Sequence, residues 1–112
     1  MILEMRTYTL HPGKMAEYFK VYEAQGFEVQ KRILGGFVGS FVSEIGPLNQ
    51  VVHLWAFRDL NDRAARRAAL AANPQWQAAV TNFIGFFAQQ ESKILNPSSR
   101  TSLLDGVVPA EA

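Results

Sequence analysis

The chain of 112 residues is 48% hydrophobic and 19% charged, which is the length and composition of one soluble domain. Eleven Lys and Arg residues against ten Asp and Glu residues give a formal net charge of +1, so no global field favours nucleic acid or an anionic membrane. The absence of cysteine excludes thiol catalysis, disulfides and thiolate-bound metals. The apolar runs are far shorter than the roughly 20 residues of a membrane helix, and the charged start does not resemble a secretory signal. We therefore expect a cytoplasmic protein that does not span a membrane.

The first third of the sequence predicts one strand followed by one helix. From residue 2 to residue 10 two sets of side chains alternate, as they do on the two faces of a β-strand. Turn residues at 11–14 interrupt this pattern, and apolar residues then recur at spacings of three and four over 15–33, which predicts a helix. Gly26 lies on the apolar stripe of that helix, where a glycine indicates a bend or the close approach of another backbone.

The remainder of the chain predicts further strands and helices. Residues 37–45 and 51–57 have the length and composition of strands and are joined by turn residues, so we expect an antiparallel pair. Residues 59–72 are Ala-rich and begin with capping residues, which predicts a short helix. An Asn-Pro pair then begins a second helical stripe over 73–87. A last strand is expected over 89–95.

The predicted element order is βαββαβ, with the second helical segment split in two. This is the order of an α+β, ferredoxin-like subunit, a four-stranded antiparallel sheet with helices on one face. We assign residues 1–97 to this domain and residues 98–112, which have no clear period, to a C-terminal tail. The side chains expected on the uncovered face are Phe37, Phe41, Ile45, Val51, Trp55 and Phe57. Because such a face needs a second cover, we expect a homodimer.

Several motifs carry a resemblance to a known family. They are Glu4-Met5-Arg6-Thr7-Tyr8, the turn His11-Pro12-Gly13-Lys14, the run from Glu44 to Trp55 that contains Gly46-Pro47-Leu48-Asn49-Gln50, the arginines Arg63, Arg66 and Arg67, and Pro74-Gln75-Trp76. On these residues the chain resembles the NIPSNAP proteins, which belong to the dimeric α/β-barrel proteins. The resemblance implies a ferredoxin-like subunit that pairs through its sheet into a barrel.

The resemblance implies less about activity than about fold. The name of the family records a link to vesicle transport, its mitochondrial members resemble signalling or scaffold proteins, and its small single-domain members have no settled biochemical activity. Related dimeric barrels include cofactor-free monooxygenases, haem-degrading enzymes and small isomerases. Because one fold hosts many functions, the function has to be argued from the site.

Polar and aromatic side chains on two predicted strands form the most informative group. Glu4, Arg6 and Tyr8 alternate on the first strand, and His53 and Trp55 alternate on the third. These strands are neighbours in this fold, so a period of two places all of these side chains on one face. There Arg6 would bind a carboxylate or enolate oxygen, Tyr8 would donate a hydrogen bond and His53 would exchange a proton near neutral pH, which makes these three the candidate catalytic residues. Trp55 would supply an apolar wall.

Two interpretations of this face remain open. In the first, a homodimeric barrel binds a small, partly apolar molecule between sheet and helices, with the option of a metal- and nucleotide-independent oxidoreductase or isomerase reaction. Its candidate binding residues are Glu4, Trp55, Asn49, Tyr22 and Trp76, and Tyr18, Phe19 and Phe83 would frame the same pocket or simply fill the core. In the second, the chain is a non-catalytic interaction or scaffold protein whose polar and aromatic face forms an interface, with Glu4 paired to Arg6.

Metal and haem chemistry has little support in the sequence. The two histidines, His11 and His53, lack the spacing of metal ligands, so we expect no metal and no other cofactor. A haem would need only one histidine, but nothing in the sequence requires it.

The helix predicted over 59–72 carries three arginines, so we considered whether it binds nucleic acid. Asp59 and Asp62 precede Arg63 and Arg66 at helical spacing, which together with Arg67 predicts a solvated, salt-bridged face rather than a phosphate patch. RNA-recognition domains share the βαββαβ order, but the third strand here lacks their basic, glycine and aromatic pattern. We therefore expect no nucleic-acid partner.

Overall fold

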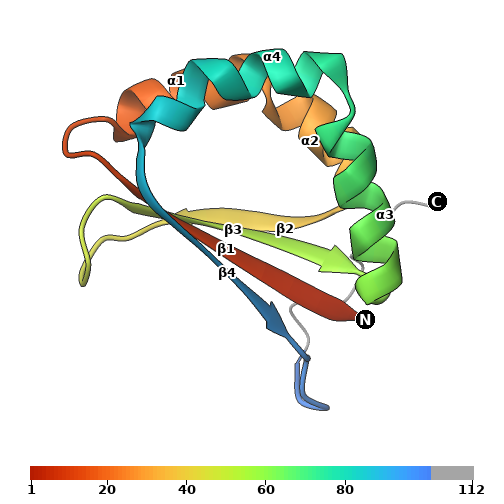
Figure 1. The fold of residues 1–112 in the computed structure, drawn as a ribbon. Coiled ribbons are helices and arrows are strands. Elements are labelled where there is room, and N and C mark those ends of the chain that lie inside the picture. The colour runs from red at the N-terminus through yellow and green to blue at the C-terminus, as the bar shows by residue number, and fades with distance from the viewer. Residues whose placement is uncertain (102–112) are drawn as a thin grey trace.

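Strands and covering helices make up the part of the chain that the computed structural model describes, residues 1–101. In chain order the elements are β1 (Ile2–Leu10), α1 (Met15–Gln25), α2 (Phe27–Leu34), β2 (Gly36–Val42), β3 (Gln50–Phe57), α3 (Leu60–Ala71), α4 (Pro74–Phe83), the 3₁₀ turn η1 (Ile84–Phe86) and β4 (Phe87–Leu95). The strands form one antiparallel sheet in the order β2-β3-β1-β4, and the helices lie over one of its faces (Figure 1). The predicted ferredoxin-like α+β fold is confirmed. Most of the predicted tail, 98–112, lies outside the described residues.

None of the helices within residues 1–101 is long and apolar enough to cross a membrane.

The first predicted helix is broken into α1 and α2 at Gly26. A Cβ atom at this position would lie 3.2 Å from Cζ3 of Trp76 and 3.3 Å from Cδ1 of Tyr22. The bend predicted at Gly26 is confirmed, but the group that approaches it is an aromatic side chain of α4 and not another backbone. The missing side chain therefore lets α4 pack close to the junction of α1 and α2.

The Asn-Pro pair begins α4 as the sequence predicts. The side chain of Asn73 accepts a hydrogen bond from the backbone N–H of Trp76 at 3.0 Å, and Pro74 occupies the first turn. The predicted end of this helix is wrong, because α4 ends at Phe83 and a 3₁₀ turn leads directly into β4 at Phe87. Phe87 is thus a strand residue.

The sheet has an inner face, which the helices cover, and an outer face. Glu4 of β1 is paired with Trp55 of β3, and both side chains are 0% exposed beneath the helices. The next pair along these strands, Met5 and Leu54, points to the opposite, outer face because successive side chains alternate. The predicted polar and aromatic group on β1 and β3 therefore shares the inner face.

The expectation that an aromatic row lies on the uncovered face is wrong for most of its members. Val51, Trp55 and Phe57 are buried on the inner face, and the ring of Phe37 packs on that of Trp55 with 5.0 Å between centroids. Ile45 lies in the loop between β2 and β3 and is 93% exposed. Of the predicted residues, only Phe41 is paired with an outer-face residue, Val52. The reason is a bulge in β2 between Phe37 and Gly39, which places Phe37 and Phe41 on opposite faces.

Buried side chains between the inner face and the helices form two clusters. The first contains Tyr8, Leu10, Tyr18, Tyr22, Val51 and Phe83, and the second contains Leu34, Trp55, Phe57 and Leu70. Trp76 of α4 packs against both clusters. It therefore lies where the two parts of the core meet.

Candidate functional site

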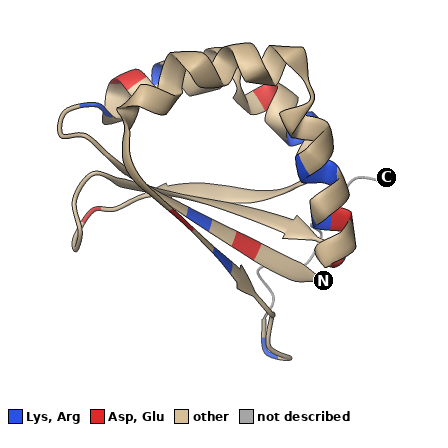
Figure 2. Cartoon of the chain, viewed as in Figure 1, with Lys and Arg blue, Asp and Glu red and all other residues tan. Residues whose placement is uncertain are grey.

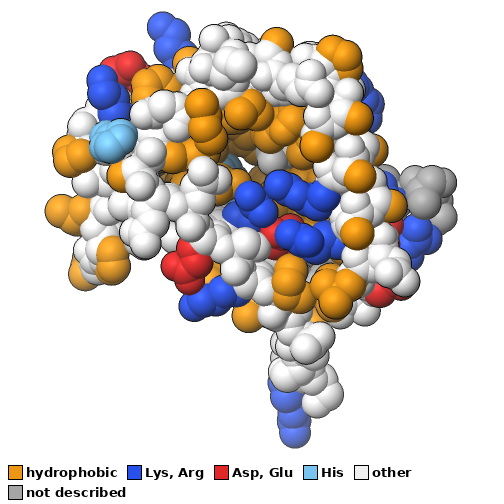
Figure 3. Space-filling view, in the orientation of Figure 1, with side chains coloured by type: hydrophobic (Ala, Val, Ile, Leu, Met, Phe, Trp, Pro, Cys, Tyr) orange, Lys and Arg blue, Asp and Glu red, His pale blue; other side chains and the backbone are white. Residues whose placement is uncertain are grey.

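A cavity of about 180 Å³ lies between the inner face of the sheet and the helices. Its lining includes Arg6 and Tyr8 of β1, Tyr18 and Tyr22 of α1, Gln30 of α2, His53 of β3, Arg67 of α3, and Trp76, Val80 and Phe83 of α4. Figure 3 shows the hollow, with hydrophobic side chains in its depth and Lys and Arg side chains gathered at its edge. The site therefore has an apolar interior and a basic rim.

Aromatic rings form most of the apolar wall. Tyr18 and Tyr22, one helical turn apart on α1, are stacked with 5.4 Å between centroids. Phe83 of α4 meets both rings edge-on, each at 5.9 Å, and Trp76 lies 5.7 Å from Phe83. Because each ring is held by at least one other ring, the wall is rigid and suits a flat apolar group.

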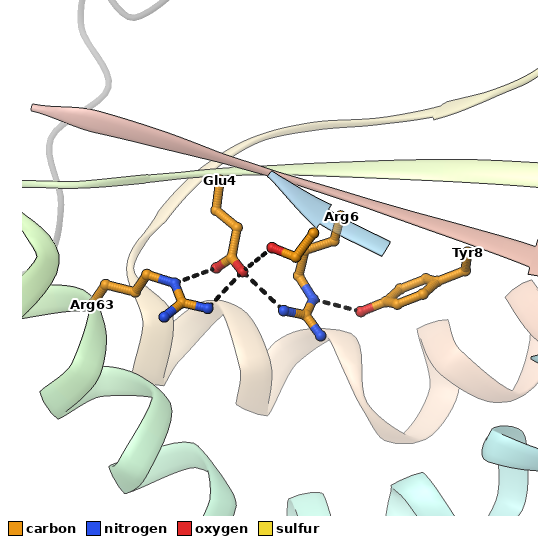
Figure 4. A network of polar contacts seen from close by, with 5 residues as sticks. Glu4, Arg6, Tyr8 and Arg63 are labelled. Atoms are coloured by element: carbon orange, nitrogen blue, oxygen red, sulfur yellow. Dashed lines mark hydrogen bonds and ion pairs between the residues drawn. The ribbon is translucent and has the colours of Figure 1, made fainter. Parts of the chain in front are cut away.

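Glu4 is the centre of a polar network that joins β1 to α3 (Figure 4). Arg63 donates to it twice, from Nε to Oε1 at 3.1 Å and from Nη2 to Oε2 at 2.9 Å. Arg6 Nη1 and Ser92 Oγ donate to Oε2 at 2.9 and 2.7 Å. Burial by itself would raise the pKa of Glu4, but the hydrogen bonds from Arg63 and Ser92 and the charge of Arg6 lower it to about 2. Glu4 is therefore an ionised carboxylate with no free oxygen for chemistry.

Arg6 connects this network to the cavity. Its Nε donates to the hydroxyl of Tyr8 at 2.7 Å, while its Nη1 is held by Glu4. Burial would lower the pKa of Arg6, but Tyr8 and Glu4 raise it above its usual value. Because the Tyr8 oxygen accepts this bond, its own proton remains for a second partner. Glu4 and Arg6 are paired as the second interpretation predicts, but inside one subunit rather than across an interface.

His53 is held on both ring nitrogens. Nε2 lies 2.7 Å from the hydroxyl of Tyr18, and Nδ1 lies 2.5 Å from Oγ of Ser40. Burial of the ring and the nearby charge of Arg6 lower the pKa of His53 to about 4. At neutral pH the ring is therefore neutral, with one nitrogen donating and the other accepting. This environment does not agree with proton exchange near neutral pH, and a metal or haem ligand role would break one of the two hydrogen bonds.

The two tyrosines of α1 remain protonated. Burial raises the pKa of Tyr18 and of Tyr22 well above the usual range. The hydroxyl of Tyr22 donates to Oε1 of Gln30 on α2. Sequence reasoning missed Gln30, although it follows Tyr22 and Gly26 at spacings of four and so lies on the same helical stripe.

The ion pair predicted between Asp62 and Arg66 is confirmed, but it is buried, so the arginines of α3 do not form the predicted solvated face. Arg63 binds Glu4, and Nε of Arg66 donates to Oδ1 of the buried Asp62 at 2.8 Å. Figure 2 shows basic positions of α3 near the charged positions of β1. The physical reason is that these arginines lie three, four and seven residues before the buried Leu70, which places them on the helix face that turns toward the sheet.

Arg67 is the arginine of α3 that reaches the cavity. Its Nη1 is buried and has no hydrogen-bond partner among residues 1–101. Burial and the nearby charge of Arg6 lower the pKa of Arg67, but a guanidinium stays protonated at any physiological pH. Arg67, which lines the cavity, therefore carries one buried cationic donor, Nη1, that no described side chain satisfies.

The predicted site residues divide into two groups. Arg6, Tyr8, Tyr22, His53 and Trp76 line the cavity. Glu4 and Trp55 lie on the same inner face but outside the lining, Glu4 behind Arg6 and Trp55 in the second core cluster. Asn49 is in the loop before β3, where its backbone is left-handed with φ 62° and its carbonyl accepts from the N–H of Leu10 at 2.8 Å. The structure therefore does not bring Asn49 to the cavity.

The described residues, 1–101, offer no cluster of side chains suited to binding a metal ion. Within 1–101, no three His, Cys, Asp or Glu side chains gather closely enough to hold a metal ion.

Comparison with known proteins places the chain in a family. The NIPSNAP family pattern matches residues 3–101. The chain belongs to the NIPSNAP family. It is 36% identical over 96 residues to the protein NipSnap homolog of Dictyostelium discoideum, an alignment that covers 86% of this chain and 42% of that relative. It covers only 19% of a NipSnap relative from Caenorhabditis elegans, so it spans less than half the length of these curated relatives.

Solved structures of other NIPSNAP proteins have the same fold over nearly their full length. A NIPSNAP family protein of unknown function from Agrobacterium tumefaciens is 46% identical, with a TM-score of 0.90 over 92% of this chain and 93% of that chain. An antibiotic biosynthesis monooxygenase is only 12% identical but has a TM-score of 0.64 over 88% of this chain and 99% of its own. The second likeness concerns the fold alone.

Proposed function

We propose that the cavity of this NIPSNAP protein binds a small, partly apolar molecule. The observation that carries the proposal is the cavity itself, a volume of about 180 Å³ bordered by aromatic side chains and by the polar groups of Arg6, Tyr8 and Arg67. Protein interiors have few voids larger than a water molecule, and an apolar cavity of roughly 150 Å³ holds benzene. The volume therefore matches a single ring with a small substituent.

The arrangement of polar groups supports binding in a defined orientation. Ligand sites combine apolar walls with a few placed polar groups, and here Arg6, Tyr8 and Arg67 accompany the aromatic walls. Arg6 is held by Glu4 and in turn holds the Tyr8 hydroxyl, so these groups are positioned before any ligand arrives. Such preorganisation lowers the entropic cost of binding.

A cofactor-independent reaction, of oxidoreductase or isomerase type, is the second candidate function. One observation favours it, a row of hydrogen bonds from the exposed Ser40 through His53 to the Tyr18 hydroxyl in the cavity. Such a row can carry a proton between solvent and a bound molecule. Its test is whether a molecule recovered from the protein changes during incubation, in mass if it is oxidised or reduced or in NMR spectrum at constant mass if it is isomerised, or returns unaltered. We place binding first, because at neutral pH His53 is neutral and Tyr18 is protonated.

The second interpretation, a scaffold protein that binds a partner through its polar and aromatic face, does not fit the position of that face. Trp55 and Glu4 are 0% exposed beneath the helices, so the polar and aromatic inner face is not available to a protein partner. For the outer face we propose contact with a second copy of the chain, because it carries Met5, Val52 and Leu54 and the half-exposed Phe41. Sedimentation analysis tests this proposal: the wild type is expected as a dimer and Leu54→Lys as a monomer, and a monomeric wild type contradicts it.

Native mass spectrometry of the protein purified from its own host tests small-molecule binding. We expect a defined small mass that stays bound under gentle conditions and is released on denaturation. Val80→Phe, which fills the cavity, should abolish it, whereas Thr81→Phe, on the exposed side of the same helix, should keep it. Equal retention by both variants would place the molecule elsewhere and contradict the proposal.

A further inference from the structure

The starting observation is the unpaired guanidinium nitrogen Nη1 of Arg67. This side chain lines the cavity, and its Nη1 is buried with no hydrogen-bond partner in the described part of the chain. Leaving a buried charged donor without a partner is costly, so native proteins seldom retain one. In a site that binds ligands, the missing acceptor is the expected contribution of the ligand.

The charged side chains around the cavity indicate the sign of the charge on that ligand. Arg6, Arg63 and Arg67 face a single carboxylate, Glu4, which leaves this group with a charge of +2. Glu4 is fully occupied, because it accepts from both Arg63 and Arg6 (Figure 4). Among these three arginines, Arg67 is the one that has no described hydrogen bond to a carboxylate within residues 1–101.

The remaining lining defines the rest of the molecule. Tyr22, Trp76 and Phe83 offer an apolar wall, while Arg6 and Tyr8 of β1 and Arg67 of α3 supply the polar groups. A guanidinium edge matches the two oxygens of a carboxylate, and the retained proton of Tyr8 can donate to the same group. The volume of about 180 Å³ leaves room for one ring beside it.

We infer that the ligand is a small carboxylate with a ring-sized apolar body, whose anionic group binds Arg67. This inference rests on the proposed function and adds the chemical class of the ligand. It also makes Arg67 a binding residue, whereas the sequence pattern predicts a solvated face that Arg67 shares with Arg63 and Arg66.

Calorimetric titration with two probes of the same ring size tests the inference. Benzoate carries the carboxylate and benzyl alcohol is its neutral counterpart. A charge-assisted hydrogen bond is worth roughly 1.5–3 kcal/mol, so the wild type should bind benzoate about tenfold or more tightly than benzyl alcohol. Arg67→Gln should weaken the binding of benzoate far more than that of benzyl alcohol, so that the preference for benzoate is lost. Arg32→Gln, at an exposed position of α2, is the matched control and should behave as the wild type.

The outcomes separate the inference from the proposed function. If the wild type binds benzyl alcohol as tightly as benzoate, the cavity remains a binding site and the anionic class is wrong. If Arg67→Gln keeps the preference for benzoate, Arg67 is not the anchor and the inference also fails. If the wild type binds neither probe, the cavity does not bind a ring-sized molecule, and both the inference and the proposed function fail. The comparison of the probes in the wild type does not depend on the variant being folded.

Discussion

Glu4 and Arg63 lie 59 positions apart in the sequence and form a two-point ion pair, with Nε and Nη2 of Arg63 at 3.1 and 2.9 Å from the two carboxylate oxygens. The pair joins a central strand of the sheet to α3, the helix that also carries Arg67. Glu4 is 0% exposed, so its charge is compensated by protein groups rather than by bulk water. The ionised carboxylate of Glu4 therefore helps to hold α3, together with the buried Leu70, against the sheet.

Acid should weaken the fold through Glu4. Its pKa is lowered from 4.5 to about 2 in the folded protein, so its contribution is fully present above pH 4.5 and is lost as the pH falls toward 2. A shift of this size corresponds to about 3 kcal/mol. Urea unfolding at several pH values should show a steeper loss of stability below pH 4.5 for the wild type than for Glu4→Gln. Equal slopes would mean that Glu4 is not held as an ionised group.

Removal of two neighbouring arginines should have different effects on stability. Arg63→Met leaves Glu4 with fewer partners in a buried site and should cost about 2 kcal/mol, less than for an isolated buried pair because Arg6 and Ser92 remain. Arg67→Met removes a cation that has no described partner and should be neutral or stabilising. Urea denaturation of both variants without ligand makes the comparison. A loss for Arg67→Met as large as that for Arg63→Met would assign Arg67 a structural role.

His53 should stay neutral through physiological pH. Its pKa is lowered from 6.5 to about 4 by burial and by Arg6, so the folded protein resists protonation that the unfolded chain accepts. The associated stability is present above pH 6.5 and is lost as the pH falls toward 4. NMR titration of the ring protons measures this directly. A midpoint near 6.5 would contradict the buried, doubly hydrogen-bonded ring and would restore an acid–base role near neutrality.

Truncation of Trp55 should strongly destabilise the protein. The side chain is 0% exposed and packs against Phe37, so Trp55→Ala should cost roughly 3–5 kcal/mol. Trp76→Ala is the matched comparison and should cost less, because Trp76 is only partly buried and borders the cavity. Equilibrium unfolding in urea checks both values. A negligible loss for Trp55→Ala would place its ring on a surface rather than in the core.

Local patterns predicted the elements and their capping well. The Asn73 cap, the first-turn Pro74 and the alternation of Glu4 and Arg6 depend on residues close in sequence, and the structure agrees with them. Alternation shows which side chains share a face, but it does not show which face the helices cover. Trp55 was therefore expected on the open side and lies on the covered one. The bulge between Phe37 and Gly39 decides the face of Phe41, and its one sign in the sequence is a glycine inside the predicted strand.

The candidate site was harder to predict because its contacts are distant in sequence. Arg63 has acidic neighbours at helical spacing, so local rules predict a surface salt bridge, yet its partner is Glu4 on another element. Arg67 follows the same helix face into the cavity. Asn49 belongs to a motif that carries the family resemblance, but it shapes a turn, as its positive φ and its bond to Leu10 indicate.

A heteronuclear NMR titration with benzyl alcohol tests the binding cavity most directly, because it locates a neutral ligand without relying on any charged residue. The cavity predicts the largest chemical-shift changes at Tyr18, Tyr22, Val80 and Phe83, with little change at Met5 on the outer face. No change at the cavity residues, or larger changes on the outer face, would contradict the assignment of this cavity as the site of small-molecule binding.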